Sequence, residues 1–186
     1  IAIIDKDVVD ESNINRQIVA LTSTIGKNKV DVMKQRMLDI NPDVKVEAHC
    51  EFYLPDNADF IELGSFDYVV DAIDNVTAKI ELIKRCKQAD VPIISAMGAG
   101  NKLDPTRIEI ADISKTSVCP LAKVIRRKLA DLGIEGVTVA YTREIPANAS
   151  GGRTPASMMP VPAVMGLTMA SKVLRDLSGM RIKSKS

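Results

Sequence analysis

Short apolar runs alternate with amphipathic segments along the whole chain, and this alternation constrains the fold more than any other feature. Each apolar run has the length of a strand, and the longer segments repeat their apolar residues at helical spacing. After Gly26, four apolar residues share one helical face: Val30, Met33, Met37 and Ile40. Strands are predicted at 1–4, 44–48, 66–73, 91–96, 107–113 and 137–141, and helices at 27–40, 55–63, 75–89, 120–132 and 162–177.

Strands that alternate with helices in this way are typical of an open, largely parallel sheet with helices on both faces. We therefore predict a doubly wound α/β fold. A chain of 186 residues is long enough for one such domain, and we place it at 1–178. A loop rich in Gly and Pro is expected at 146–157, and the basic tail at 179–186 is expected to be disordered.

The composition narrows the classes of function. A net charge of +1 favours no partner by itself, so a surface for nucleic acid has to be a local patch. Aromatic residues make up only 3% of the chain, which argues against a row of aromatics that stacks single-stranded bases. Cys50, Cys86 and Cys119 form no CxxC pair, so neither a zinc site nor a disulfide framework is indicated. Reduced thiols are typical of a cytoplasmic protein.

Acidic residues follow two of the predicted strands. Asp5 ends the first strand, and Asp71 and Asp74 come at the end of the strand at 66–73. In doubly wound folds this edge of the sheet binds nucleotides, and an acid there commonly holds ribose hydroxyls. A further carboxylate suits Mg²⁺. The alternative explanations are a simple turn for Asp5 and helix capping by Asp74 or Asn75.

Two basic residues lie between these acids in the chain. Arg16 follows a turn-rich segment, and Lys29 lies in the first turn of the helix after Gly26. Arg and Lys neutralise the phosphates of a nucleotide in different geometries. A solvated surface charge is the alternative explanation for each of them.

Three motifs in this order resemble the ThiF/MoeB and ubiquitin-activating enzyme family. They are IDKDVVDESNINRQ at 4–17, GKNKV at 26–30 and DAIDN at 71–75. The resemblance implies a Rossmann-like adenylyltransferase that binds ATP and Mg²⁺ and activates a carboxylate as its adenylate.

The resemblance also implies roles for individual residues. Asp5 is expected to hold the ribose, and Asp74 is expected to bind Mg²⁺. Arg16 and Lys29 are expected to contact the phosphates, with Arg16 and Asp74 as the catalytic residues. Two further residues are expected to shape the same site: Asn13 and Gln17.

The family places a Gly-rich turn from strand to helix just before the first strand seen here. The backbone N–H groups of that turn cradle phosphates. Because this chain opens at Ile1 inside a strand, we expect the first strand and helix of the fold to be missing from it. Such a fragment is expected to bind ATP poorly.

The middle of the chain resembles the tRNA threonylcarbamoyladenosine dehydratase branch of the family. The resemblance lies in GAGNKLDPTR at 98–107, ADISKT at 111–116 and PLA at 120–122. That branch uses ATP to activate the carboxylate of threonylcarbamoyladenosine in tRNA, after which the side chain closes into a ring with net loss of water. tRNA is therefore the expected partner, and the family also implies a homodimer.

An RNA substrate requires a basic surface. Lys123, Arg126 and Arg127 lie at positions i, i+3 and i+4 of one predicted helix, on one of its faces. We predict a tRNA contact there, with a solvated helix face as the alternative. Three more basic residues precede this face and extend the predicted contact: Lys102, Arg107 and Lys115.

Other functions fit part of this pattern. Activation of a ubiquitin-like or sulfur-carrier protein would use the same ATP residues, but the paired CxxC zinc motifs frequent in that branch are absent. A non-catalytic nucleotide-binding module is a second alternative. A dinucleotide-dependent oxidoreductase is a third, although Arg16 and Lys29 fit a triphosphate better. Cys119 is a candidate nucleophile at a predicted helix start, but a small residue before Pro120 explains it more simply.

Overall fold

The computed structural model describes residues 1–147 and 156–180. The chain divides into two compact units, Ile1–Asn57 and Ala58–Ser186. Much of the loop expected at 146–157, and most of the tail expected at 179–186, lies outside the described residues. The single ATP-binding domain at 1–178 stays a prediction.

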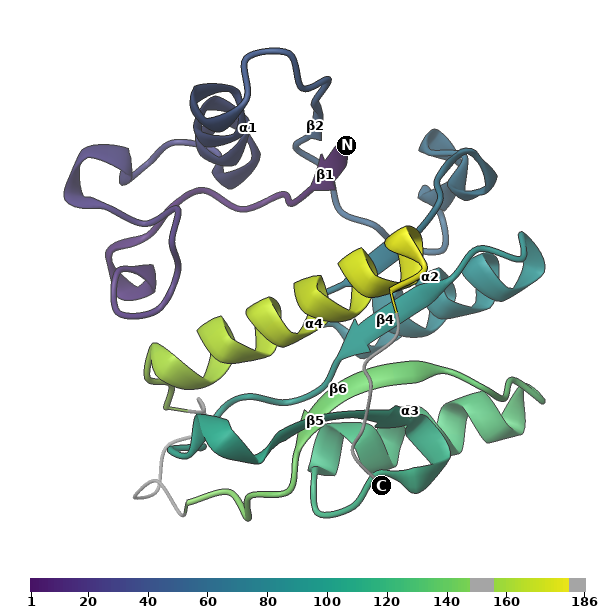
Figure 1. Ribbon diagram of the computed structural model, residues 1–186. Coiled ribbons are helices and arrows are strands. Elements are labelled where there is room, and N and C mark those ends of the chain that lie inside the picture. The colour runs from purple at the N-terminus through teal and green to yellow at the C-terminus, as the bar shows by residue number, and fades with distance from the viewer. Residues whose placement is uncertain (148–155, 181–186) are drawn as a thin grey trace. The chain divides into compact units, whose positions relative to one another are not determined.

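The first unit is built as strand, helix, strand (Figure 1). β1 (Ala2–Ile4) pairs in parallel with β2 (Glu47–His49). Parallel neighbours need a crossover connection, and α1 (Lys29–Ile40) lies in this crossover and packs against β2. Two short 3-10 turns precede the helix, at Glu11–Asn13 and Thr22–Thr24.

The first unit contains a small hydrophobic cluster. Its buried members are Val9, Val19 and Ala20, and the partly buried Val32 and Met33 of α1 pack against them. Ile40 ends the apolar face predicted for this helix, and it is 74% exposed. Ile40 is the last residue of α1, and the chain turns away at the extended C-cap Asn41.

The second unit contains a four-stranded sheet in the order β3-β4-β6-β5. The first three strands are parallel, and β5 runs antiparallel at the edge. The strands are β3 (Val69–Asp71), β4 (Ile93–Ala96), β5 (Ile108–Asp112) and β6 (Thr138–Thr142). The helices are α2 (Val76–Gln88), α3 (Pro120–Asp131) and α4 (Pro160–Ser178).

Helices cover both faces of this sheet. Successive residues of a strand point to opposite faces, and β4 shows the two sides. Ile94 belongs to a core cluster with Met165 and Met169 of α4, whereas the hydroxyl of Ser95 accepts a hydrogen bond from Lys79 of α2. The helices α4 and α2 therefore lie on opposite faces (Figure 1), which confirms the predicted α/β fold with a largely parallel sheet.

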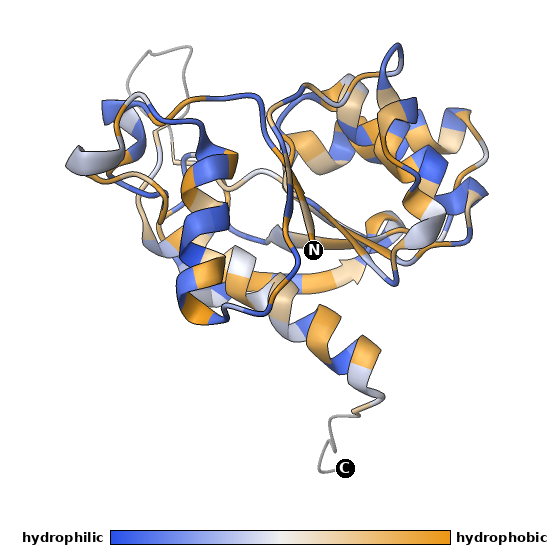
Figure 2. Cartoon of the chain, turned by 90° about the horizontal axis from the view of Figure 1, so that it is seen from above, coloured by the Kyte–Doolittle hydropathy of each residue, from blue (hydrophilic) through white to orange (hydrophobic). Residues whose placement is uncertain are grey.

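The helix α4 is apolar beyond its buried face. Met165 and Met169 are buried, but Leu167, Leu174 and Leu177 are exposed. Coloured by hydropathy, α4 carries hydrophobic and hydrophilic residues along its whole length (Figure 2). Part of the apolar surface of this helix thus lies outside the core of the second unit.

Two predicted elements are shorter than expected. The helix predicted at 55–63 is reduced to 3-10 turns at Ala58–Phe60 and Leu63–Ser65. The side chain of Asn57 bonds to the backbone of Phe52 and Leu54, which gives the chain an alternative to a helix. The strand predicted at 66–73 is only β3, because the carboxylate of Asp71 accepts a bond from the Ile73 N–H and turns the chain there.

Within the described residues, no helix is both long enough and apolar enough to cross a membrane.

We expect Ile94→Ala to destabilise the second unit strongly. The Ile94 side chain is fully buried between β4 and α4, and an Ile→Ala change in a core typically costs about 2–5 kcal/mol. Urea unfolding followed by circular dichroism measures this loss. The same change at Ile145, which is 75% exposed, should shift the free energy of unfolding by no more than about 0.5 kcal/mol. Equal losses in the two variants would contradict the assignment of the core.

Candidate functional site

The first unit brings Asp5 and Lys29 together. A short antiparallel bridge pairs Val8 with Asn28, and the Lys29 N–H donates to the carbonyl of Asp7 at 2.9 Å. This pairing places the Lys29 ammonium 2.9 Å from Asp7 Oδ2 and 3.9 Å from Asp5 Oδ2. The two residues predicted to bind ribose and phosphate are therefore neighbours, with Asp7 as a third member of the group.

The charge of Lys29 is balanced by these acids. Its side chain is only 12% exposed, whereas that of Asp7 is 48% exposed. The hydrogen bond from Lys29 is the main reason that the pKa of the Asp7 carboxyl lies below its usual value. A phosphate that binds Lys29 would compete with a half-exposed carboxylate, which solvent screens well.

The turn between Asp10 and Gln17 is organised by Asn13. The Asn13 side chain is buried and its Oδ1 accepts from the Asp10 N–H at 3.1 Å. Its backbone carbonyl accepts from the N–H groups of Arg16 and Gln17. Asn13 thus shapes this segment from inside. Hydrogen bonds from the side chain of Ser12 and from its backbone N–H lower the pKa of the Asp10 carboxyl.

Arg16 is half-buried and partly engaged within the same turn. Its Nη1 donates to the Ser12 carbonyl at 2.8 Å and to Asn15 Oδ1 at 2.9 Å. A guanidinium has five N–H donors in a planar fork, so these bonds orient the group and leave donors for an anion.

In the second unit, the turn from β3 into α2 presents Asp74. Asn75 is the N-cap of α2, and its Oδ1 accepts from the Ala78 N–H at 3.0 Å. Asp74 is exposed, and within the described residues no hydrogen bond or ion pair engages its carboxylate. Of the two capping alternatives, Asn75 performs the capping and Asp74 stays available.

Asp71, by contrast, is completely buried and paired with Lys79 at 2.8 Å. The sequence pattern did not reveal Lys79, which lies on the buried side of α2 next to Ile83 and Cys86. The sequence did hold a signal for this buried lysine. Lys79 is spaced at i, i+4 and i+7 with the apolar residues Ile83 and Cys86, and it follows the strand-end Asp71 by eight positions.

Lys102 does not belong to an exposed basic surface, and its place in the predicted tRNA contact is wrong. Its side chain is buried and donates to the carbonyl of Glu144. Burial lowers the pKa of the Lys102 ammonium. The Glu144 carboxylate in turn accepts from the N–H groups of Leu103 and Asp104, so this lysine joins the loop after β4 to the end of β6.

On α3, two of the three predicted tRNA contacts form no ion pair or side-chain hydrogen bond with the part of the chain that the structure describes. Lys123 and Arg127 are exposed. Arg126 is half-buried, and its Nη1 donates to the carbonyl and the hydroxyl of Thr116 at 2.9 and 2.7 Å. Arg126 therefore links α3 to Thr116 in the segment before the helix. Lys115, which was also predicted to contact tRNA, is exposed.

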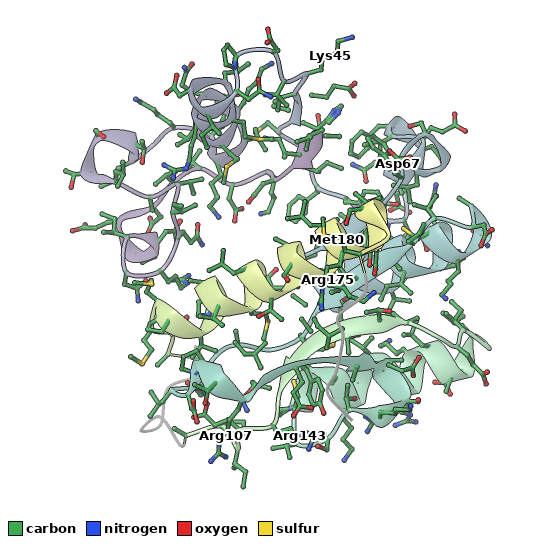
Figure 3. The ribbon with its side chains drawn as sticks, in the orientation of Figure 1. Lys45, Asp67, Arg107, Arg143, Arg175 and Met180 are labelled. Atoms are coloured by element: carbon green, nitrogen blue, oxygen red, sulfur yellow. The ribbon has the colours of Figure 1, made fainter. Side chains whose placement is uncertain are left out.

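Arg107 lies at the end of the β5–β6 pair, close to Arg143 (Figure 3). Arg107 is paired with Asp104 at 3.1 Å, and Arg143 with Glu109 at 2.9 Å. Each of these exposed cations already has a carboxylate partner.

The three cysteines behave as small core or surface residues. Cys86 is fully buried, and burial raises the pKa of its thiol to about 12, so it stays protonated. Cys119 is buried at the N-cap of α3, where a Cβ added to Gly98 would lie 3.5 Å from its sulfur. Cys50 is exposed.

Comparison with known proteins shows which family this chain resembles. The profile of the ThiF family matches residues 1–186. The tRNA threonylcarbamoyladenosine dehydratase of Bacillus subtilis is 44% identical over 207 aligned residues, which cover 100% of this chain and 81% of that protein. The Escherichia coli protein of the same name is 41% identical over 136 residues, which cover 72% of this chain and half of that protein.

A solved structure shows the same fold. It is E. coli tRNA N6-threonylcarbamoyladenosine dehydratase in complex with ATP, with a TM-score of 0.88 and 33% identity. The match covers 96% of this chain and 75% of that one.

We expect Lys29→Met to destabilise the protein more at pH 7 than at pH 3. Because the folded-state pKa of Asp7 is lowered, the stabilisation from the pair is present above the unfolded-state value of about 3.9 and disappears as the pH falls through the lowered value. The loss at pH 7 should be about 0.2–1 kcal/mol, since Asp7 is half-exposed.

Urea unfolding at both pH values tests this expectation. Lys34→Met is the control, because Lys34 lies on the same helix and forms no ion pair among the described residues. A loss for Lys29→Met that is equal at pH 7 and pH 3 would mean that packing, rather than charge, is responsible.

Proposed function

Because this chain belongs to the ThiF family, we propose that it uses ATP to activate the carboxylate of threonylcarbamoyladenosine in tRNA, which then cyclises with loss of water. The single observation that carries the proposal is the 44% identity over the whole chain with the dehydratase of B. subtilis. The ATP-bound E. coli structure of the same fold supports ATP as the nucleotide.

In this reaction the substrate carboxylate attacks the α-phosphate of ATP, the bond to pyrophosphate breaks, and an acyl adenylate forms. Closure of the ring then expels AMP, so the oxygen lost from the nucleoside leaves with the nucleotide. A carboxylate is already a nucleophile and needs no general base. The work of the protein is positioning and charge neutralisation.

The first unit supplies groups for the nucleotide. We assign Asp5 to the ribose hydroxyls and Arg16 and Lys29 to the phosphates. Arg16 is oriented by the turn that Asn13 organises. Lys29 is held near Asp5 by its ion pair with Asp7. A bound phosphate would replace the Asp7 carboxylate as the partner of Lys29.

Mg²⁺ fits the exposed carboxylate of Asp74. Within the described residues, no group of three His, Cys, Asp or Glu side chains is arranged to hold a metal. Mg²⁺ is commonly held by one or two carboxylates together with phosphate oxygens and water. When bound, it would neutralise charge on the phosphates, and Asp74 would orient it.

We assign the tRNA contact on α3 to Lys123 and Arg127, with Lys115 beside them in the chain. Arg126 supports this surface from within. A tRNA substrate is consistent with the cytoplasmic location that we propose. The homodimer and, as an alternative substrate, the C-terminal Gly of a ubiquitin-like or sulfur-carrier protein stay predictions.

The proposed chemistry can be tested directly. Full-length protein mixed with Mg·ATP and tRNA that carries threonylcarbamoyladenosine should remove one water from that nucleoside, as measured by digestion and mass spectrometry. Asp74→Ala should lower the rate by about a hundredfold or more, because a charge-stabilising contact is lost. Asp67→Ala is the control, since Asp67 is an exposed acid just before β3 (Figure 3).

An unchanged nucleoside would contradict the proposal. If pyrophosphate exchange then appeared only after addition of a carrier protein that ends in Gly-Gly, the substrate would be the carrier. Equal activity of Asp74→Ala and Asp67→Ala would remove Asp74 from the site.

The proposed tRNA contact can be tested separately. The double variant Lys123→Glu/Arg127→Glu should weaken tRNA binding without a change in ATP affinity. The slope of the logarithm of the tRNA binding constant against the logarithm of the salt concentration should fall by about one unit for each lost phosphate contact. Filter binding at several salt concentrations measures both effects. A control with the same charge change, Lys34→Glu/Arg36→Glu on α1, should bind tRNA as the wild type does. Wild-type tRNA affinity in the α3 variant would exclude this face.

A further inference from the structure

The ammonium group of Lys79 is buried without any exposed surface. It donates to Asp71 Oδ2 at 2.8 Å, to the carbonyl of Ala96 at 3.0 Å and to Ser95 Oγ at 3.3 Å. A lysine has three N–H donors, so every donor is used. The partners come from β3 and β4, and all of them lie at the carboxyl ends of those strands.

Asp71 is equally well satisfied. Its Oδ2 accepts from Lys79 and from the Ser95 hydroxyl at 2.5 Å. Its Oδ1 accepts from the backbone N–H of Ile73 at 2.9 Å. The carboxylate therefore links the buried lysine to the backbone that leaves β3.

Stability alone is a weak reason for such a pair. Replacing a buried ion pair with apolar residues of similar volume is often neutral or stabilising, because both charges lose their hydration. A role in geometry is the better-attested reason to keep one. The question is which part of the molecule this pair holds in place.

The pair holds the turn that carries Asp74. Residues 72–75 connect β3 to α2, and Asp71 Oδ1 fixes the start of this turn at Ile73. Asn75 fixes its end as the N-cap of α2. Lys79 lies one helical turn further on, and its N–H donates to the Asn75 carbonyl at 3.0 Å. Asp74 has no partner of its own among the described residues, so its position is set by these neighbours.

We propose that Lys79 is a positioning residue, which acts through Asp71 to hold Asp74 where it can bind the Mg²⁺ of Mg·ATP. The proposal rests on the proposed function, because it assumes that Asp74 binds this ion. Residues that orient a metal ligand typically change metal affinity by 10–100-fold when they are replaced.

The test replaces the pair by apolar residues in the full-length protein, as Asp71→Leu/Lys79→Met. Two binding constants for ATP are measured by calorimetry, one with Mg²⁺ and one with EDTA. The variant should keep the wild-type affinity in EDTA and lose the gain in affinity that Mg²⁺ gives, by about tenfold. The Mg²⁺ concentration needed for half-maximal dehydration should rise to a similar extent.

A matched control lies on the same helix. Glu81 and Arg85 form a second acid–base pair on α2, away from the β3–α2 turn. Glu81→Leu/Arg85→Met should show wild-type dependence on Mg²⁺ even where its melting temperature falls. A pair with a purely structural role would make the two double variants behave alike.

A milder variant covers the case in which Asp71→Leu/Lys79→Met does not fold. Ser95→Ala removes one donor to Asp71 with the loss of a single oxygen atom, and it should raise the Mg²⁺ requirement by about threefold, below the range for a complete replacement. The proposal is overturned if the folded variants respond to Mg²⁺ as the unmodified protein does. It is also overturned if the ATP affinity of the unmodified protein does not depend on Mg²⁺. Mg²⁺-dependent ATP binding without dehydration would instead reject the proposed substrate and leave this inference standing.

Discussion

The second unit depends on one buried positive charge, the ammonium of Lys79. A charge in an apolar interior is costly unless it is paired and hydrogen-bonded. Here the full set of partners comes from the ends of two adjacent strands. The helix α2 can therefore satisfy its lysine only when it packs against the ends of β3 and β4, so the ion pair fixes α2 on this end of the sheet.

The first unit pairs a lysine with a carboxylate after a strand in a different way. Lys79 and Asp71 are both fully buried, whereas Asp7, the partner of Lys29, is 48% exposed. Solvent weakens an exposed pair and leaves it free to exchange partners, while a buried pair keeps its geometry. The difference suits two tasks. Lys29 can leave its carboxylate partner and pair with an arriving phosphate, and Lys79 can hold a turn in place.

The fold was largely predictable from the sequence because its signals are local. Strand length, helical spacing and the acids after β1 and β3 each depend on neighbouring residues. Lys79 was missed for the opposite reason: it shares the buried face of Ile83 and Cys86, but a lysine in an amphipathic helix is normally solvated. Only the contacts with Asp71, Ser95 and Ala96, formed once the chain has folded, make that position tolerable. Lys102, buried under Glu144, escaped prediction in the same way.

The basic surface shows how far spacing alone can go. The spacing placed Lys123, Arg126 and Arg127 on one face, yet Arg126 is bound to Thr116. Of the cations before α3, Lys102 is buried and Arg107 is paired with Asp104, whereas Lys115 is exposed. Few free charges therefore remain on this surface, and the net charge of the chain is only +1. Because non-specific affinity for RNA grows with the number of phosphates neutralised, this surface can supply only a modest share of it. We therefore expect recognition of the substrate to depend mainly on the modified nucleoside itself, whose carboxylate is the group to be adenylated.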